Sequence, residues 1–359
     1  MSDRVFVAMS GGVDSSVAAA LLADRGHDVV GVWMRLSRER VQSDAPRCCG
    51  TDEAGEDARR AAAHLGIPFY ALDYADVFGS AVVDRFVASY AQGETPNPCV
   101  ACNAFVKFEA LMRDVIAKFG GTRLATGHYA RVVENAGGRY RLLRAHDSAK
   151  DQSYALYMLG QRELARTVLP IGELRGKDET RALAVKYGLP NAATADSMDI
   201  CFVPTDHRDL VRARAPEAFT PGPVERRDGT VIGTHDGIGS LTIGQRRGIG
   251  VAAGERLYVL RLDLERNAAV VGARDEVATR AYALRDLRFT AGAPPASAFT
   301  STVALRYRGT PILCEVEVAG DGAVVRLTEP ALVAPGQAAV LYDRDEVIGG
   351  GTVGRALAA

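Results

Sequence analysis

The sequence lacks several features that would place it in common protein classes. No apolar run in its 359 residues approaches the roughly 18 residues that span a bilayer, and its first residues hold no apolar segment typical of a secretory signal. Six cysteines are too few for a disulfide scaffold in a chain of this length. The formal net charge is only −1, so no large positive field indicates a nucleic-acid partner. We therefore expect a cytoplasmic protein whose cysteines are structural residues, metal ligands or catalysts, and in which any binding of nucleic acid would depend on local groups of charges.

The composition and pattern of the chain indicate a folded protein with more than one domain. Hydrophobic residues make up 47% and charged residues 24%, which is typical of globular domains. The first half alternates apolar runs with helical patterns, as in a parallel sheet covered by helices. Beyond residue 205, short β-rich runs separated by Gly, Pro and Asp-Gly replace the helical periodicity. We predict an α/β fold with a catalytic parallel-sheet domain over 1–207, a β-rich domain over 208–277 and a small β-barrel over 278–359.

Several elements can be assigned to residue ranges. Strands of the parallel sheet are expected at 4–9, 28–36, 68–72 and 123–126, and helices at 16–25, 52–65 and 77–91. In the last domain, a Pro-containing linker over 291–299 is expected to precede strands at 302–307, 312–318, 323–327 and 338–342.

Residues 9–16, MSGGVDSS, lie between the first predicted strand and the first predicted helix. The glycines allow the backbone to approach a phosphate, the serines add hydroxyl donors, and the amide groups of a helix N-terminus attract an anion. The loop has no lysine, so it differs from the GxxxxGK[ST] loop that serves γ-phosphate transfer. It resembles instead the PP-loop, SGGxDS, of enzymes that split ATP into AMP and pyrophosphate. Asp14 would lie beside the phosphates with Mg²⁺ between them. The alternative is a Gly-Ser turn that only caps a helix.

Two further residues are expected near this loop. Ligands of open α/β sheets bind at the carboxyl ends of the strands. Met34 ends the second predicted strand and Gly127 follows the strand at 123–126, so both are positioned to meet a nucleotide.

Cys99 and Cys102 form a CxxC within TPNPCVACNAFVKF. We predict that Asn103 caps the next helix, which would place Cys102 beside a helix N-terminus, where the positive potential favours the thiolate. Cys201 lies in DSMDICFVP, which we interpret as a strand whose alternation separates Cys201 from its two apolar neighbours. Each of these thiols can be a nucleophile or a small buried side chain.

The remaining cysteines carry weaker signals. Cys314, in ILCEVEV, is expected to be a buried core residue. Cys48 and Cys49 lie in a polar loop and their role stays open.

A set of motifs covers nearly the whole chain: SGGVDSS, GVWM, TPNPCVACN, ATGHYAR, KDQSYALY and DICFV, with GQRRGIG and RYRG further along. Together they resemble the bacterial tRNA 2-thiouridylase (MnmA) family of the PP-loop ATP pyrophosphatase superfamily. The resemblance implies a sulfurtransferase that uses ATP and Mg²⁺ to thiolate the wobble uridine of the tRNAs for Lys, Glu and Gln. It also implies a cysteine desulfurase or a relay protein as sulfur donor. One departure is that many members read NPD where this chain reads NPC at 97–99.

The resemblance also implies roles for individual residues. Cys102 and Cys201 would be the catalytic pair, with a persulfide on Cys201 and a disulfide between the two at the end of the reaction. ATP would be bound by Ala8, Met9, Ser10, Gly11, Gly12, Val13, Asp14, Ser15, Met34 and Gly127. The tRNA would be contacted by Asn97, Pro98, Cys99, His128, Lys150, Asp151, Gln152, Arg306, Tyr307 and Gln337.

Three other interpretations remain open at this point. A PP-loop can serve an amidotransferase or ligase, although no glutaminase-like segment is evident. Cys99, Cys102 and Cys201 could hold a [4Fe-4S] cluster, as in related tRNA thiolases. A non-catalytic RNA-binding protein with a decayed nucleotide site is disfavoured, because the loop keeps its glycines, Asp14 and serines.

Overall fold

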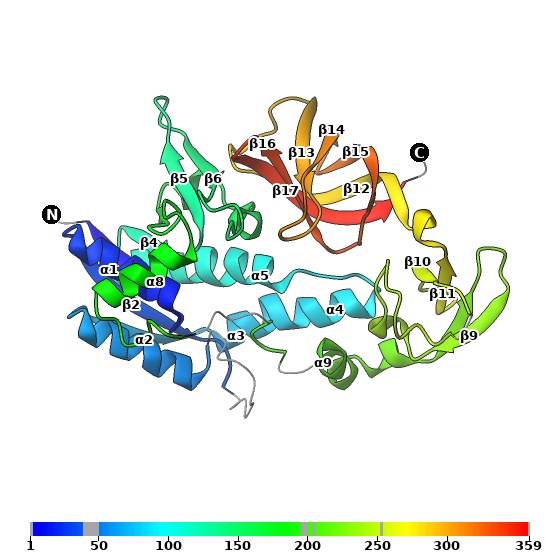
Figure 1. Ribbon diagram of the computed structural model, residues 1–359, viewed down its shortest axis with the longest axis horizontal. Coiled ribbons are helices and arrows are strands. Elements are labelled where there is room, and N and C mark those ends of the chain that lie inside the picture. Colours follow the sequence, from blue (N-terminus) through cyan, green and yellow to red (C-terminus); the bar gives the residue numbers. More distant parts are fainter. Residues whose placement is uncertain (1–2, 39–49, 195–199, 204–205, 252–253, 358–359) are drawn as a thin grey trace.

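The computed structural model describes residues 3–38, 50–194, 200–203, 206–251 and 254–357. Figure 1 shows a parallel sheet with helices on both faces, a smaller sheet at the opposite end of the molecule, and a barrel above the helices that join them. The predicted fold class is therefore confirmed. Within the described ranges, none of the helices is both long enough and apolar enough to cross a lipid bilayer.

The N-terminal sheet consists of parallel strands in the order β3-β2-β1-β4-β7. Their bounds are β1 Arg4–Ala8, β2 Asp28–Arg35, β3 Phe69–Asp73, β4 Arg123–Thr126 and β7 Thr167–Val168. The four predicted strands end within one residue of their observed bounds, whereas the short edge strand β7 was not predicted. Valine-rich β2 pairs on both sides and is largely buried, as its almost continuous apolar run indicated.

The two faces of this sheet carry different helices. Successive side chains of β1 point to opposite faces. Val5 and Val7 share a core with α1 (Val13–Asp24), α2 (Asp52–His64) and α8 (Lys177–Lys186). Phe6 belongs to the other core, which includes Val106 and Leu111 of the longer helices described next. The first face positions the phosphate loop and the second carries the thiols.

Two helical segments run next to each other across the molecule (Figure 1). One comprises α3 (Ala75–Phe78), η1 (Gly79–Asp84) and α4 (Arg85–Ala91), and the other α5 (Pro98–Ala101), η2 (Cys102–Leu111) and α6 (Met112–Ala117). Their middle parts, η1 and η2, have the wider π-helical geometry, which is frequent at functional sites. The second segment bears the CxxC.

A small β-rich unit follows α9 (His207–Arg214) and η4 (Pro216–Phe219). Its strands have the order β10-β11-β8-β9, with β8 Gly222–Glu225, β9 Val231–His235, β10 Tyr258–Asp263 and β11 Ala268–Gly272. The short turns η5 (Ile238–Ser240) and η6 (Arg274–Glu276) complete it. Val224, Val259 and Val271 form its core with Leu241.

The last unit is a closed antiparallel barrel in the order β12-β15-β14-β13-β16-β17, with β12 pairing with β17. The strands are β12 Ala278–Phe289, β13 Ala298–Ala304, β14 Ile312–Ala319, β15 Gly322–Leu332, β16 Ala338–Asp343 and β17 Glu346–Ala356. In β14, Cys314 and Val316 point into the barrel while Glu315 and Glu317 point out. This alternation confirms that Cys314 is a core residue, and burial raises the pKa of its thiol to about 12.

One prediction about this barrel was wrong, and one of its strand pairings was not predicted. The segment 291–299 does not precede the barrel but connects β12 to β13 within it. The sheet also extends beyond the last domain, because the hairpin of β5 (Ala130–Glu134) and β6 (Tyr140–Arg144) pairs with β17. Arg139 and Arg141 of the hairpin form ion pairs with Glu346 at 2.7 and 2.6 Å. The first and last regions are thus joined by strand pairing that sequence periodicity does not reveal.

Candidate functional site

The phosphate loop follows β1 and begins α1, as predicted. Gly11 has φ +83°, and a Cβ atom there would lie 2.3 Å from the carbonyl oxygen of Ala54, so only glycine fits without a shift. Ser15 Oγ accepts a hydrogen bond from the amide of Ser10 at 3.1 Å and donates one to the carbonyl of Gly12 at 3.1 Å. Among the described residues, no side chain caps the start of α1 at Gly12. The first amide groups of the helix are therefore left for an anion.

The other predicted nucleotide residues lie around the same loop. A Cβ atom on Gly127 would lie 2.6 Å from the amide nitrogen of Ser15, so the backbone after β4 packs directly against the loop. Ala8 ends β1, and the amide of Met9 continues the ladder by donating to Val32 at 2.8 Å. Met34, near the end of β2, packs against the same core as Ala8.

Asp14 lies in the first turn of α1 and has partners that the sequence did not indicate. Lys177 Nζ donates to both of its carboxylate oxygens, at 2.8 and 2.9 Å, and the Tyr129 hydroxyl donates to one of them at 2.9 Å. Tyr129 also forms a 2.8 Å hydrogen bond with Thr180 of α8. The loop is thus tied to α8, which begins about 160 residues later in the chain.

Asn191 is a second residue that the sequence did not reveal. Its side-chain nitrogen donates to the carbonyl of Gly11 at 2.8 Å and to Ser16 Oγ at 2.9 Å. Asn191 is only 4% exposed, so these bonds are shielded from water. No local pattern marks Asn191 or Lys177, because both reach the loop only through the tertiary fold.

The CxxC helix begins earlier than predicted. Asn97 is its N-cap, with its side-chain oxygen accepting from the amides of Cys99 at 3.1 Å and Val100 at 3.3 Å, and Pro98 occupies the first turn. Asn103 is not a cap: it is buried inside the helix and donates to the carbonyl of Ala155 at 2.8 Å. The pattern Asn-Pro, a cap residue followed by a proline in the first position, was the signal for the true start.

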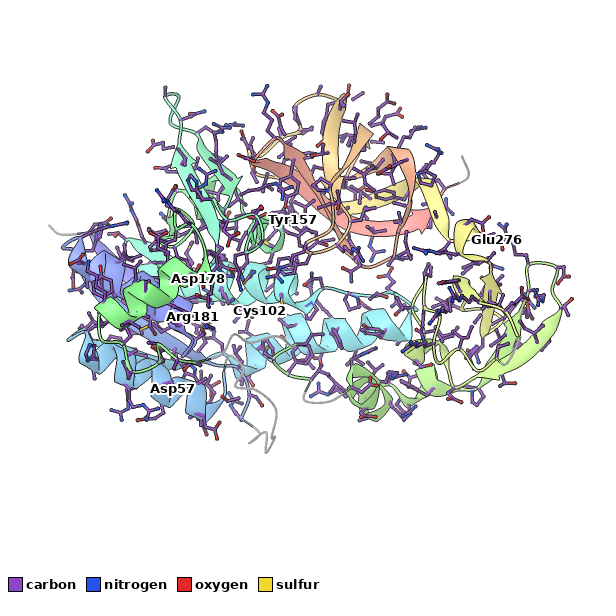
Figure 2. The ribbon with its side chains drawn as sticks, in the orientation of Figure 1. Asp57, Cys102, Tyr157, Asp178, Arg181 and Glu276 are labelled. Carbon is purple, nitrogen blue, oxygen red and sulfur yellow. The ribbon has the colours of Figure 1, made fainter. Side chains whose placement is uncertain are left out.

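The shifted start changes the surroundings of the two thiols. Cys99 is exposed in the first turn, where the helix potential acts, while Cys102 lies one turn further in and is 9% exposed. Figure 2 places Cys102 near the centre of the molecule, between the N-terminal sheet and the barrel. The argument that Cys102 is activated by a helix N-terminus is therefore wrong, because its amide group is already inside the continuous helical segment.

Cys201 lies in a turn and not in the predicted strand. The turn is closed by a 3.0 Å hydrogen bond from the amide of Val203 to the carbonyl of Ile200. Phe202 anchors it, edge-on against Phe78 at 5.6 Å and Phe86 at 5.2 Å between ring centroids. Cys201 packs against the core that contains Cys102, Ala8 and Met34, whereas Ile200 packs against a different cluster. The predicted separation of Cys201 from Ile200 holds, although a turn produces it, but the predicted separation from Phe202 does not, because Phe202 packs against both clusters.

Some residues with an implied tRNA role have clear partners inside the protein. Asp151 is buried, accepts from the amides of Ala145 and Ser153 at 3.0 and 3.1 Å, and pairs with Arg144 at 3.2 Å. Gln152 forms two hydrogen bonds with the backbone of Tyr129. Its side-chain oxygen accepts from the amide of Tyr129 at 2.9 Å, and its own amide donates to the carbonyl of Tyr129 at 2.8 Å. Lys150 is half-buried, and its amide donates to the carbonyl of Asp147. The KDQ motif therefore shapes the turn before η3 (Ser153–Leu156).

The residues after KDQ attach this turn to the barrel. The Tyr154 hydroxyl donates to the carbonyl of Ala338 in β16 at 2.7 Å, and Ser153 Oγ lies 3.3 Å from the Tyr342 hydroxyl. The Arg144 guanidinium stacks over the Tyr342 ring at 3.6 Å. Further along, α7 (Gln161–Leu164) supplies Gln161, which donates to the carbonyl of Thr290 at 2.7 Å. The motif KDQSYALY is thus an interface between the first and last regions.

His128 lies next to Gly127 and faces the CxxC helix. Its Nδ1 is 2.7 Å from Thr126 Oγ1, and its ring is 6.3 Å from the Phe108 ring. Burial, with a smaller effect of the Lys107 ammonium, holds the pKa of His128 well below its usual range. At neutral pH it is a neutral hydrogen-bonding group.

The implied barrel residues fall into two places. Arg306 and Tyr307 are exposed in the turn between β13 and β14, with the Tyr307 ring 6.3 Å from that of Tyr154. Gln337 instead lies directly before β16, and its side-chain Nε2 donates to the carbonyl of Thr95 at 2.9 Å.

Residues 93–95, which we call the junction, contact both C-terminal units just before the CxxC helix. Glu94 forms a two-pronged ion pair with Arg285 of β12 at 2.8 and 2.7 Å. The amide of Thr95 donates to the carbonyl of Pro335 at 2.8 Å, and its hydroxyl donates to Thr242 of the central unit at 3.2 Å. The position of the CxxC helix is therefore tied to the barrel and the central sheet.

The described residues give no support to a metal cluster. Among them, no three or more His, Cys, Asp or Glu side chains come together in a way that could hold a metal ion. Cys99, Cys102 and Cys201 all lie in the described ranges, so their arrangement does not fit a [4Fe-4S] cluster and we derive no step through one. Cys48 and Cys49 lie outside the described residues.

Comparison with known proteins accounts for the whole chain. Three family models match in succession: the tRNA methyl transferase HUP domain at residues 3–205, the tRNA methyl transferase PRC-barrel domain at 208–273 and the aminomethyltransferase beta-barrel domain at 279–353. A protein of Chloroflexus aggregans named tRNA-specific 2-thiouridylase MnmA is 46% identical over 98% of each chain. Proteins of the same name from Moorella thermoacetica and Heliobacterium modesticaldum are 44% and 42% identical over 97% and 99% of this chain, and over 98% and 94% of their own. With identity this high from end to end, the chain belongs to the family of tRNA-specific 2-thiouridylases.

Proposed function

We propose that this protein uses ATP to replace the C2 oxygen of the wobble uridine in tRNA with sulfur. The observation that carries the proposal is that Cys201, Ala8 at the end of β1 and Met34 of β2 all pack against the hydrophobic core that includes Cys102. Two thiols distant in sequence are thus associated with one core, and we infer that both reach a nucleotide bound at the phosphate loop. The wobble uridines of the tRNAs for Lys, Glu and Gln are the proposed targets, in the cytoplasm where tRNA is found.

The first chemical step is activation of the base. The C2 oxygen of uracil is a poor leaving group, so it would attack the α-phosphorus of ATP, forming an adenylated base and releasing pyrophosphate. The loop from Ser10 to Ser15 would hold the departing pyrophosphate with the first amides of α1. Mg²⁺ would accompany the phosphates, with Asp14 as the carboxylate available to it.

The second step is sulfur transfer. A persulfide on Cys201, supplied by a cysteine desulfurase or a relay protein, would deliver its outer sulfur to C2 while AMP leaves. Cys102 would attack the inner sulfur and either liberate sulfide or assist direct transfer. A Cys102 to Cys201 disulfide would remain, and an external thiol reductant would restore both thiols. The half-buried turn of Cys201 suits a residue that must be loaded by a partner, and the buried Cys102 suits a residue that acts only within the site.

The C-terminal regions would hold the RNA. RNA is recognised largely by shape and by bases that leave their stack, and the target uridine must leave the anticodon stack to reach the thiols. We propose that residues 1–207 carry out the chemistry while 208–277 and 278–359 hold the anticodon arm. Arg306 and Tyr307 of the barrel are exposed, as is Cys99, so these implied contacts are accessible to such a ligand. His128 and Asn97 would act closer to the base.

The decisive test is nucleoside mass spectrometry of unmodified tRNA incubated with the protein, ATP, Mg²⁺ and a persulfide source. We expect 2-thiouridine to form and AMP and pyrophosphate to be released with it. If ATP is split but no 2-thiouridine forms, an amide-forming ligase becomes the better interpretation of the phosphate loop.

A further inference from the structure

The phosphate loop has no lysine of its own, yet a lysine from another element lies against it. Lys177 is the first residue of α8, and its ammonium donates to both oxygens of the Asp14 carboxylate. Its side chain is only 10% exposed, whereas that of Asp14 is 31% exposed. Taking an ammonium out of water costs free energy even when the ammonium is paired, so stability alone does not explain this placement.

The surrounding residues hold Lys177 at the loop. Gly176, directly before it, has φ +142°, a conformation that favours glycine. Tyr129 bridges Asp14 and Thr180 through its hydroxyl, at 2.9 and 2.8 Å. Figure 2 shows α8, marked by Asp178 and Arg181, beside α1. The ammonium is therefore aimed at the start of α1, where the phosphates are expected.

The charges of Asp14, Lys177 and pyrophosphate suggest what the ion pair between Asp14 and Lys177 does. Pyrophosphate carries several negative charges, and Asp14 alone would repel it. A carboxylate and a phosphate accept hydrogen bonds from the same ammonium donors, so they compete for Lys177.

We propose that Lys177 is the cationic residue of the phosphate site. It neutralises Asp14 while the loop holds no phosphate, and it binds the pyrophosphate part of ATP when the nucleotide enters, leaving Asp14 to Mg²⁺. The inference rests on the proposed ATP-dependent function and names the residue that would stabilise the leaving group.

Calorimetric titration of the full-length protein with pyrophosphate, ATP and AMP tests this role. Lys177→Gln should weaken binding of pyrophosphate and ATP by about tenfold or more, since a hydrogen bond to a charged group is lost, while AMP binding stays unchanged. Lys177→Arg should keep most of the pyrophosphate affinity because it keeps the charge. Lys186→Gln, at the exposed end of the same helix, is the matched control and should bind all three ligands as the unmodified protein does.

A second variant tests the competition itself. Without Mg²⁺, Asp14→Asn should bind pyrophosphate more tightly than the unmodified protein, and the gain should be clearly smaller when Lys177→Gln is also present. A gain of equal size with and without Lys177 would come from lost repulsion alone and would overturn the proposal. Equal loss of AMP and pyrophosphate binding in Lys177→Gln would also overturn it, because that result indicates a structural role.

These outcomes are separate from the test of the function. If pyrophosphate binding depends on Lys177 but no 2-thiouridine is made from tRNA, the proposed function fails and the role of Lys177 stands. If 2-thiouridine forms and pyrophosphate binding is indifferent to Lys177, the function stands and the role of Lys177 is rejected.

Discussion

The two segments that bear the proposed catalytic thiols are built in opposite ways. Cys102 is almost completely buried. It lies inside a continuous helical segment that runs from Pro98 to Ala117. Cys201 lies in a short turn, is half-buried, and is followed by Phe202, which packs edge-on against two rings. A helix orients its residues through a regular series of backbone hydrogen bonds, whereas the packing of the Phe202 ring helps to orient this turn. The difference suits a Cys102 that acts only within the site and a Cys201 that first receives sulfur from a donor.

The largest effect is expected from removing either thiol. Cys201→Ser and Cys102→Ser should each abolish detectable 2-thiouridine, because both sulfurs take part in the transfer. ATP binding, measured by calorimetry, should be unchanged in both. Loading with a labelled persulfide should separate the two roles: Cys102→Ser should still accept sulfur and Cys201→Ser should not. Full activity in either variant would remove the proposed chemistry.

A smaller but still large effect is expected from loosening the turn. Phe202→Ala removes two edge-on ring contacts, and the resulting misplacement of Cys201 should lower the rate of thiolation by about a hundredfold. Phe299→Ala is the matched control, because Phe299 makes a similar edge-on contact with Phe289 in the barrel at 6.4 Å. Single-turnover thiolation assays should show the loss for Phe202→Ala alone. Equal losses would mean that general destabilisation is responsible.

The helical side of the comparison can be weakened at its cap. Asn97→Ala removes the side chain that accepts from two amides and should lower the free energy of unfolding by about 1 kcal/mol. Thr51→Ala removes a similar cap from α2, where Thr51 accepts from the amide of Ala54 at 3.3 Å, and should cost a similar amount in a denaturant titration. Only Asn97→Ala should also slow thiolation, since Asn97 begins the helix that bears Cys102 and is itself proposed to act close to the base. Unaltered thiolation would show that the cap is purely structural.

The smallest effect is expected at the exposed thiol. Cys99→Asp restores the residue that many members of the resembling family carry, and a surface change of this kind should alter thiolation by no more than about twofold. Steady-state kinetics with tRNA as the varied substrate would detect a change. A large loss of thiolation activity would indicate that Cys99 takes part in the reaction together with Cys102 and Cys201.

The sequence predicted the position of residues 10–15, between the first strand and the first helix, better than it predicted where the helices begin. Glycine and serine after an apolar run mark such a turn clearly, whereas the role of these residues in binding phosphate stays a prediction. Asn97 and Asn103 are the same residue type, and only the proline after Asn97 distinguishes a cap from a buried amide. The turn at Cys201 has the composition of a strand, but its anchor is a pair of rings more than a hundred residues earlier.

The parts that could not be predicted depend on contacts between distant segments. Strands β12 and β17 were missed because charged residues in the first and glycines in the second weaken the alternation that marks a strand. The β5–β6 hairpin is rich in arginine, and its pairing with β17 cannot be read from local pattern. Lys177 and Asn191 carry no signal in their own neighbourhoods, because their roles depend on where α8 and the residues after it pack.

The junction at residues 93–95 has a consequence for how the protein can be divided. Both C-terminal units form hydrogen bonds with residues 93–95, directly before the helix of Cys102 begins. The barrel unit contributes Arg285, Pro335 and Gln337, and the central unit contributes Thr242. A fragment that ends after the first region would lose these contacts. The two C-terminal units, which are the proposed RNA-binding parts, therefore also help to position the helix that carries Cys102, and the proposed catalytic region depends on them for its own geometry.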